Sequence, residues 1–321
     1  MFKISSSKKV KFCMKVALIS VLVLLPLSTF AGVIMNTEYI DGTTGYTNSV
    51  FPIVYISVLA VMALFAFIFH RFFEIHYLSK EFDASKGDYT PTNISPYSQL
   101  IYSKNSSIVV FMSSFLGFAM LTSFFLLLFN LFTPDGQGIH RIVMVLLVAF
   151  MAMSGIFFIM SAAKDTSPYR RYFSILSFAP VICYSLRIIS VFMDTTRYIN
   201  TVPYYLELFT SILITLFFMF QSRFTLPDYK YHKLGTYFSC AIATVVLIFA
   251  FSVPSIISVA FFPYTVQYFA GNDIFFRLID IIVAFYIMAR LFEITTDIDQ
   301  ITEEDLKDYA RGYTGSISSR M

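Results

Sequence analysis

Residues 108–132, IVVFMSSFLGFAMLTSFFLLLFNLF, form a run of 25 residues without a single ionisable side chain. The apolar core of a bilayer is about 30 Å thick, so a helix needs about 20 apolar residues to cross it. Strands of a membrane barrel instead alternate polar and apolar residues over segments of about ten residues. The run shows no such alternation, and it therefore predicts a membrane-spanning α-helix.

The rest of the chain has the same character. Of its 321 residues, 57% are hydrophobic and only 13% are charged, whereas soluble proteins carry about 25% charged residues. We therefore expect an all-α fold, a polytopic integral membrane helical bundle with about eight transmembrane helices. The expected spans are residues 16–35, 51–69, 108–132, 142–163, 173–193, 203–222, 234–262 and 274–292.

The basic residues predict the orientation of the bundle. Nineteen of the 23 Lys and Arg residues lie before the first span, after the even-numbered spans or at the carboxyl end. Cytoplasmic loops carry such an excess, so we expect a multi-pass protein of the cell membrane with both termini cytoplasmic. The net charge of +3 follows from this bias, and it does not indicate nucleic acid as a partner.

The amino-terminal stretch has a second interpretation. Its basic start, the apolar segment Val16–Leu25 and the triplet Thr29–Ala31 also resemble a cleavable secretory signal peptide. Removal of residues 1–31 would leave seven spans and an external amino terminus. The apolar run continues through Met35, which is long enough for a retained helix, and both alternatives stay open at this point.

The sequence predicts two parts. Residues 1–292 form the bundle and include a cytoplasmic loop at residues 70–107, while residues 293–321 form an acidic, partly disordered cytoplasmic tail. Segments below about 40 residues rarely build a core of their own, so neither soluble segment is expected to hold an enzyme. Arg290 with Glu293 three residues later is typical of an interfacial anchor at a helix end.

The informative ionisable residues inside the expected spans are Arg187, Glu207, Arg277 and Asp280. Arg187 and Glu207 lie about equally far from the turn between two consecutive spans, so we expect them to meet as a salt bridge. Arg277 and Asp280 are three residues apart and share one helix face. All four are expected in the outer half of the membrane, below Asp194 and Arg197.

This polar cluster has two interpretations. Charged side chains inside a membrane are costly and often mark a pathway for ions or solutes. The functional interpretation is therefore an outward-facing site for an ion or a small charged solute. The structural interpretation is two self-satisfied ion pairs that fix helix packing, because the charges balance.

Small residues and prolines indicate how the helices pack. Ser113 with Gly117 forms one face for close helix contact, and Thr236, Cys240 and Thr244 form another. Pro180 and Pro254 fall inside spans and are expected to bend them. Three serines near Pro254 are expected to satisfy the carbonyl groups that the proline frees: Ser252, Ser255 and Ser258.

The sequence lacks the motifs of several classes of enzyme. The four histidines never form a His-Glu-x-x-His pair, and no Gly-x-Ser-x-Gly elbow, P-loop or dinucleotide fingerprint occurs. We therefore expect no catalytic residues, no metal and no cofactor, and a protein that is not an enzyme.

Three functions remain possible. The favoured one is transport or binding of a small charged solute or ion. The alternative is a non-catalytic membrane subunit or sensor that binds another membrane protein, or a second copy of itself, through its helices and tail. A membrane-embedded lipid-modifying enzyme is the weaker alternative, because no nucleophile, base and metal occur together.

Overall fold

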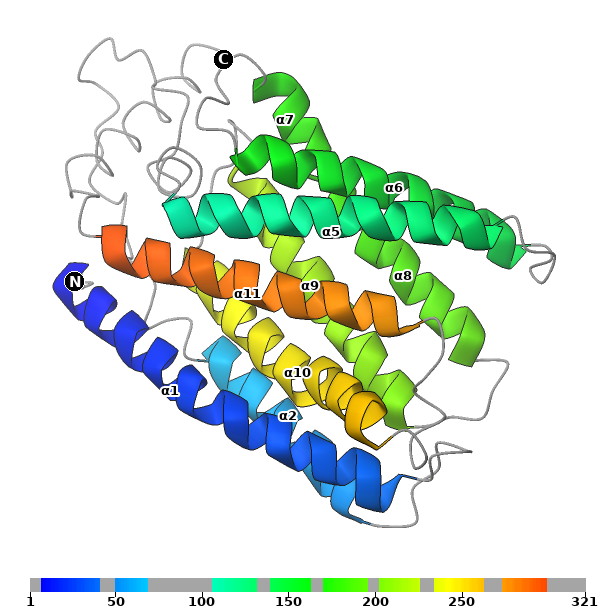
Figure 1. Ribbon diagram of the computed structural model, residues 1–321. Coiled ribbons are helices and arrows are strands. Elements are labelled where there is room, and N and C mark those ends of the chain that lie inside the picture. The colour runs from blue at the N-terminus through cyan, green and yellow to red at the C-terminus, as the bar shows by residue number, and fades with distance from the viewer. Residues whose placement is uncertain are drawn as a thin grey trace, which may run out of the picture.

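The computed structural model describes residues 7–40, 50–68, 106–131, 139–162, 170–195, 202–225, 234–262 and 273–298. All the regular elements within these ranges are helices (Figure 1). The α-helices are α1 (Ser7–Ile34), α2 (Phe51–Ile68), α5 (Ser107–Leu131), α6 (Ile139–Ala162), α7 (Arg170–Leu176), α8 (Ala179–Thr195), α9 (Val202–Arg223), α10 (Leu234–Phe261) and α11 (Asp273–Asp297). A short π-helix, η1 (Met35–Tyr39), extends α1.

Six candidate membrane spans occur among the described residues, judged by length and apolar composition. They comprise α1 with η1, α5, α6, the combined α7 and α8, α9, and α10. The described part of α2 is also apolar but shorter. The expected all-α fold is therefore confirmed, and each of the six candidate spans overlaps one of the stretches predicted to cross the membrane.

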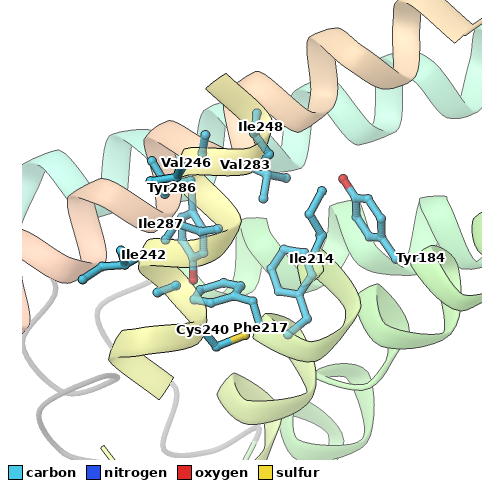
Figure 2. Packing of buried hydrophobic residues seen from close by; sticks show 14 of the residues in the cluster. Tyr184, Ile214, Phe217, Cys240, Ile242, Val246, Ile248, Val283, Tyr286 and Ile287 are labelled. Carbon is cyan, nitrogen blue, oxygen red and sulfur yellow. The ribbon is translucent and has the colours of Figure 1, made fainter. Parts of the chain in front are cut away.

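The interior of the bundle lies around α10 and α11. α11 runs between α5 and α10, and α1 lies along α10 on the other side (Figure 1). α10 is the most buried of the six candidate spans. Figure 2 shows side chains from α8, α9, α10 and α11 meeting in this core, among them Tyr184, Phe217, Val246 and Tyr286.

Glycine permits two close helix contacts. A Cβ atom on Gly117 of α5 would lie 2.9 Å from the Gly155 carbonyl oxygen of α6, so the predicted small-residue contact face at Gly117 is confirmed. A Cβ atom on Gly32 of α1 would lie 2.5 Å from Pro254 Cγ of α10. Both positions admit no larger side chain without a shift of the helices.

The carbonyl group freed by Pro254 has a different hydrogen-bond partner from the one expected. Proline has no N–H, so the carbonyl of Ala250 one turn earlier loses its helical partner. The Tyr55 hydroxyl of α2 lies 2.8 Å from this Ala250 oxygen and 3.0 Å from the Ser28 oxygen of α1. A tyrosine from another helix therefore binds the freed carbonyl, while one of the expected serines, Ser255, donates to the adjacent Phe251 carbonyl at 2.8 Å.

Pro180 divides one predicted span into two helices. α7 ends at Leu176, a turn follows at residues 177–178, and α8 begins at Ala179. The Ser177 hydroxyl lies 2.9 Å from the Thr225 hydroxyl, and Ser174 donates a hydrogen bond to the Thr225 carbonyl at 2.8 Å. The end of α9 thus anchors the break, which the sequence predicted only as a bend in a continuous helix.

The domain boundary predicted after residue 292 falls inside α11, which continues to Asp297. The loop at residues 70–105 and the tail beyond residue 298 lie outside the described residues. Ile294 and Ile298 are fully buried, so the beginning of the predicted tail belongs to the packed helix.

Candidate functional site

Three helices bring the four predicted residues together. Arg187 lies on α8, Glu207 on α9, and Arg277 and Asp280 one turn apart on α11. Arg187 Nη1 is 2.6 Å from Asp280 Oδ1, and Arg187 Nη2 is 3.1 Å from Glu207 Oε1. Arg277 Nη2 is 3.7 Å from Glu207 Oε2. We call these four residues the charge network.

The charge network is shielded from solvent. Its most exposed member, Arg277, is only 4% exposed, and Asp280 is completely buried. Aromatic rings cover both guanidinium groups: Arg187 Cζ lies 4.8 Å from the centroid of the Phe276 ring, and Arg277 Cζ lies 5.1 Å from that of Phe251. Cation–π contacts of this kind stabilise a guanidinium that has been removed from water.

The two oxygens of Asp280 are bonded unequally. Oδ1 accepts hydrogen bonds from Arg187 at 2.6 Å and from the Tyr184 hydroxyl at 3.1 Å. Oδ2 is buried and has no hydrogen-bond partner among the described residues. Glu207 differs, because each of its oxygens faces a guanidinium group. Asp280 therefore offers one oxygen that can still accept a proton or a donor group.

The ion pairs differ from the two separate pairs that the structural interpretation of the sequence predicted. The expected contact between Arg187 and Glu207 is present, but Asp280 pairs with Arg187 of α8 instead of with its helical neighbour Arg277. The charges thus form one network across three helices and not two separate pairs. The side chain of Asp194 and all of Arg197 lie outside the described residues. A ligand-binding role for the network stays a prediction.

A second polar group lies further along α11 and was not predicted. Arg290 donates hydrogen bonds to Glu293 Oε2 at 3.0 Å and to the Tyr286 hydroxyl at 3.3 Å. The Tyr286 hydroxyl also accepts a hydrogen bond from Gln221 Nε2 of α9 at 2.5 Å. The backbone N–H of Ser106, which caps α5, donates to Glu293. We call Gln221, Tyr286, Arg290 and Glu293 the Tyr286 cluster.

The side chain of Arg290 lies inside the bundle and does not project from the helix end as the expected anchor would. Arg290 is 0% exposed and is among the largest fully buried side chains of the described residues. The spacing of Tyr286, Arg290 and Glu293 is a signal that could have revealed the cluster, because i, i+4 and i+7 share one helix face. Gln221, an amide inside a predicted span, is a second such signal.

Aromatic rings separate the two polar groups. Tyr184, which binds the charge network, packs on Phe218 with ring centroids 5.8 Å apart. Phe218 packs on Phe158 at 5.6 Å, and Phe158 packs on Tyr286 at 5.4 Å. Two phenylalanine rings therefore lie between Tyr184 and Tyr286 along this chain of contacts.

Comparison with known proteins assigns no relative. No protein-family model matches the chain, and neither the curated proteins nor the solved structures contain a significant match. Among the described residues, no group of three or more His, Cys, Asp or Glu side chains is arranged to hold a metal ion. The functional conclusion therefore rests on the geometry of the buried charges.

Proposed function

We propose that this chain is a non-enzymatic multi-pass protein of the cell membrane that binds, and transports, a small charged solute or ion at the charge network. In this proposal the helices make eight spans, α2 and α11 included, and both termini are cytoplasmic. The network then lies in the outer half of the bundle.

Contacts at one end of the bundle support the proposed topology. Lys11 near the start of α1 donates a hydrogen bond to the Thr296 carbonyl near the end of α11 at 3.1 Å. The Ser106 N–H at the start of α5 binds Glu293 of α11. Three segments that the basic residues assign to the cytoplasmic face thus lie side by side.

The first helix is proposed to be retained as a span. The Thr29 hydroxyl of α1 donates to the Phe249 carbonyl of α10 at 3.0 Å, and Gly32 contacts Pro254. Both contacts lie at the site where a signal peptidase would cut. Amino-terminal sequencing of the purified protein tests this part of the proposal.

One observation carries the functional proposal: four charged side chains from three helices share a single buried network with an unbonded carboxylate oxygen. Burial of a charge in a membrane costs at least about 2.5–3.5 kcal/mol on insertion scales. Well-packed apolar residues often replace buried ion pairs without loss of stability. Four such charges are therefore more than helix packing requires, and a role in binding accounts for them.

The alternative, a subunit that binds partner helices, is supported by a different feature. α5 exposes large aromatic side chains along one face, and they recur at helical spacing. They are Phe111, Phe115, Phe118, Phe125 and Phe129. Aromatic residues are enriched in protein interfaces, although lipid chains would also cover this face.

A thermal-shift screen separates the two functions. The purified full-length protein would be heated with formate, acetate, chloride, phosphate, sodium, potassium and methylammonium salts at constant ionic strength. A bound solute at 100 times its Kd stabilises the folded state by about 2.7 kcal/mol. We expect one of these ions to raise the melting temperature of the wild type and of Arg290→Gln, but not of Arg187→Gln.

The variants make the result specific. Arg187→Gln removes a positive charge from the network, whereas Arg290→Gln removes the same charge from the Tyr286 cluster, which serves as the matched control. If no ion changes the melting temperature, or if both variants respond like the wild type, the charge network does not bind these solutes and the subunit function gains support.

A further inference from the structure

The charge balance of the network limits what it can bind. Two guanidinium groups face two carboxylates, so the four buried side chains carry no net charge when all are ionised. A bound ion adds a charge to this buried site. Because an uncompensated buried charge is strongly unfavourable, the network must change its own charge to hold the ion.

The network can change its net charge in one direction only. Arg187 and Arg277 cannot release a proton, because guanidinium groups stay charged in proteins. Asp280 and Glu207 can each accept a proton. The net charge of the network can therefore rise above zero but cannot fall below it, and the ion that restores neutrality is an anion.

Asp280 is the carboxylate placed to accept the proton. Its Oδ1 holds both hydrogen bonds, while its buried Oδ2 has none among the described residues. A proton on Oδ2 would leave the Tyr184 bond to Oδ1 in place and would weaken the ionic bond to Arg187. Glu207, in contrast, contacts a guanidinium with each oxygen.

The surroundings of Asp280 contain few other groups that titrate. α8 contributes Arg187 and Tyr184, with Cys183 beside the tyrosine, and α9 contributes Glu207. Arg277 lies one turn earlier on α11 itself. The segment forming α5 has no ionisable side chain, and that forming α10 has only a tyrosine and a cysteine, at its amino-terminal end.

We propose that the charge network binds a small monovalent carboxylate together with one proton. The proton is delivered by hydronium of the bulk solvent, which is left as water, and forms an O–H bond at Asp280 Oδ2 while the Arg187–Asp280 ion pair opens. The incoming carboxylate takes the place of the Asp280 carboxylate on the Arg187 guanidinium, whose planar fork matches such a group. One negative and one positive charge enter together, so the site stays neutral. This inference rests on the proposed function and names its substrate class.

Calorimetry of the full-length protein with formate and acetate tests the coupling. Titration in two buffers of equal pH but different ionisation enthalpy gives the number of protons taken up with each anion. We expect a value close to one proton per anion. Where Asp280 is ionised in the free protein, the apparent affinity should fall about tenfold for each unit that the pH rises.

Asp280→Asn provides the matched variant. Asparagine has the shape of the protonated carboxyl side chain but takes up no proton. The variant should bind formate or acetate with no proton uptake and with an affinity that does not vary with pH. If this variant does not fold, the proton count of the wild type still decides the question.

The outcomes separate this inference from the proposed function. Binding of methylammonium, sodium or potassium that disappears in Asp280→Asn would support a solute site at the network. It would overturn the proposal that the solute is a carboxylate taken up with a proton. Binding of formate with no proton uptake by the wild type would overturn the coupling alone. Absence of any response to anions or cations would contradict both the inference and the proposed function.

Discussion

The charge network and the Tyr286 cluster both include residues of α11, yet their charges are arranged in different ways. In the network, the bridges of Arg187 to Glu207 and Asp280 run between helices. In the Tyr286 cluster, the ion pair of Arg290 and Glu293 lies within α11 at i and i+3. A pair within one helix needs no other helix to stay intact. The inter-helix bridges depend on the positions of three helices, so a ligand that competes for one bridge acts on the whole bundle.

The largest effect is expected from Arg187→Gln. The substitution removes both bridges of Arg187, so Asp280 loses its ionic partner among the described residues while Glu207 keeps its contact with Arg277. Loss of one partner of a buried ion pair costs about 3–5 kcal/mol. Reversible unfolding by SDS in mixed micelles would measure this loss. A change below about 1 kcal/mol would show that the bridges contribute no more than surface ion pairs.

A double-mutant cycle on Arg187→Gln and Glu207→Gln sharpens the first prediction. The double variant leaves Arg277 and Asp280, one charge of each sign, so it should regain part of the stability that either single variant loses. Contacting charges couple by about 0.5–3 kcal/mol, and we expect the upper part of this range in the same unfolding assay. A double variant no more stable than the worse single variant would contradict the bridge.

The two tyrosines allow a matched comparison of hydroxyl groups. Tyr286→Phe removes the acceptor of both Gln221 and Arg290, whereas Tyr184→Phe removes a single donor to Asp280. We expect losses of about 2 kcal/mol for Tyr286→Phe and about 1 kcal/mol for Tyr184→Phe. Equal losses in the unfolding assay would mean that the number of hydrogen bonds made by a tyrosine hydroxyl does not determine its contribution to the free energy of unfolding.

The smallest effect is expected when the whole ion pair of the Tyr286 cluster is made apolar. Arg290→Met with Glu293→Leu removes two charges of opposite sign and keeps a similar volume. Such replacements are often neutral or stabilising, so the unfolding free energy should change by about 1 kcal/mol or less. A loss as large as that of Arg187→Gln would show that this pair, too, holds the bundle together.

The sequence predicted the charge network because its residues lie inside the expected spans, where an ionisable side chain is rare. The depth of Arg187 and Glu207 on either side of one turn was enough to predict their contact. The partner of Asp280 was not predictable, because it depends on which face of α8 meets α11. Spacing along one helix favoured Arg277, while the packing of three helices selected Arg187.

The Tyr286 cluster was missed for a related reason. Arg290 and Glu293 lie at the end of an apolar run, where position along the chain favours the membrane interface. Burial at that depth is decided by neighbours distant in sequence, here Gln221 of α9 and the capped start of α5 at Ser106. The hydrogen bond of Tyr55 to the carbonyl freed by Pro254 was also not predictable. A proline in the sequence predicts a carbonyl without its helical partner, but not which distant residue will bind that carbonyl.

The central claim is that the charge network binds a solute and the Tyr286 cluster does not. Calorimetric titration of formate into the folded wild type, Arg187→Gln and Arg290→Gln tests it most directly, because it measures the binding itself. The account predicts that Arg290→Gln binds with the wild-type affinity and that Arg187→Gln does not bind. Binding that is equally retained in both variants, or equally lost, would contradict the account.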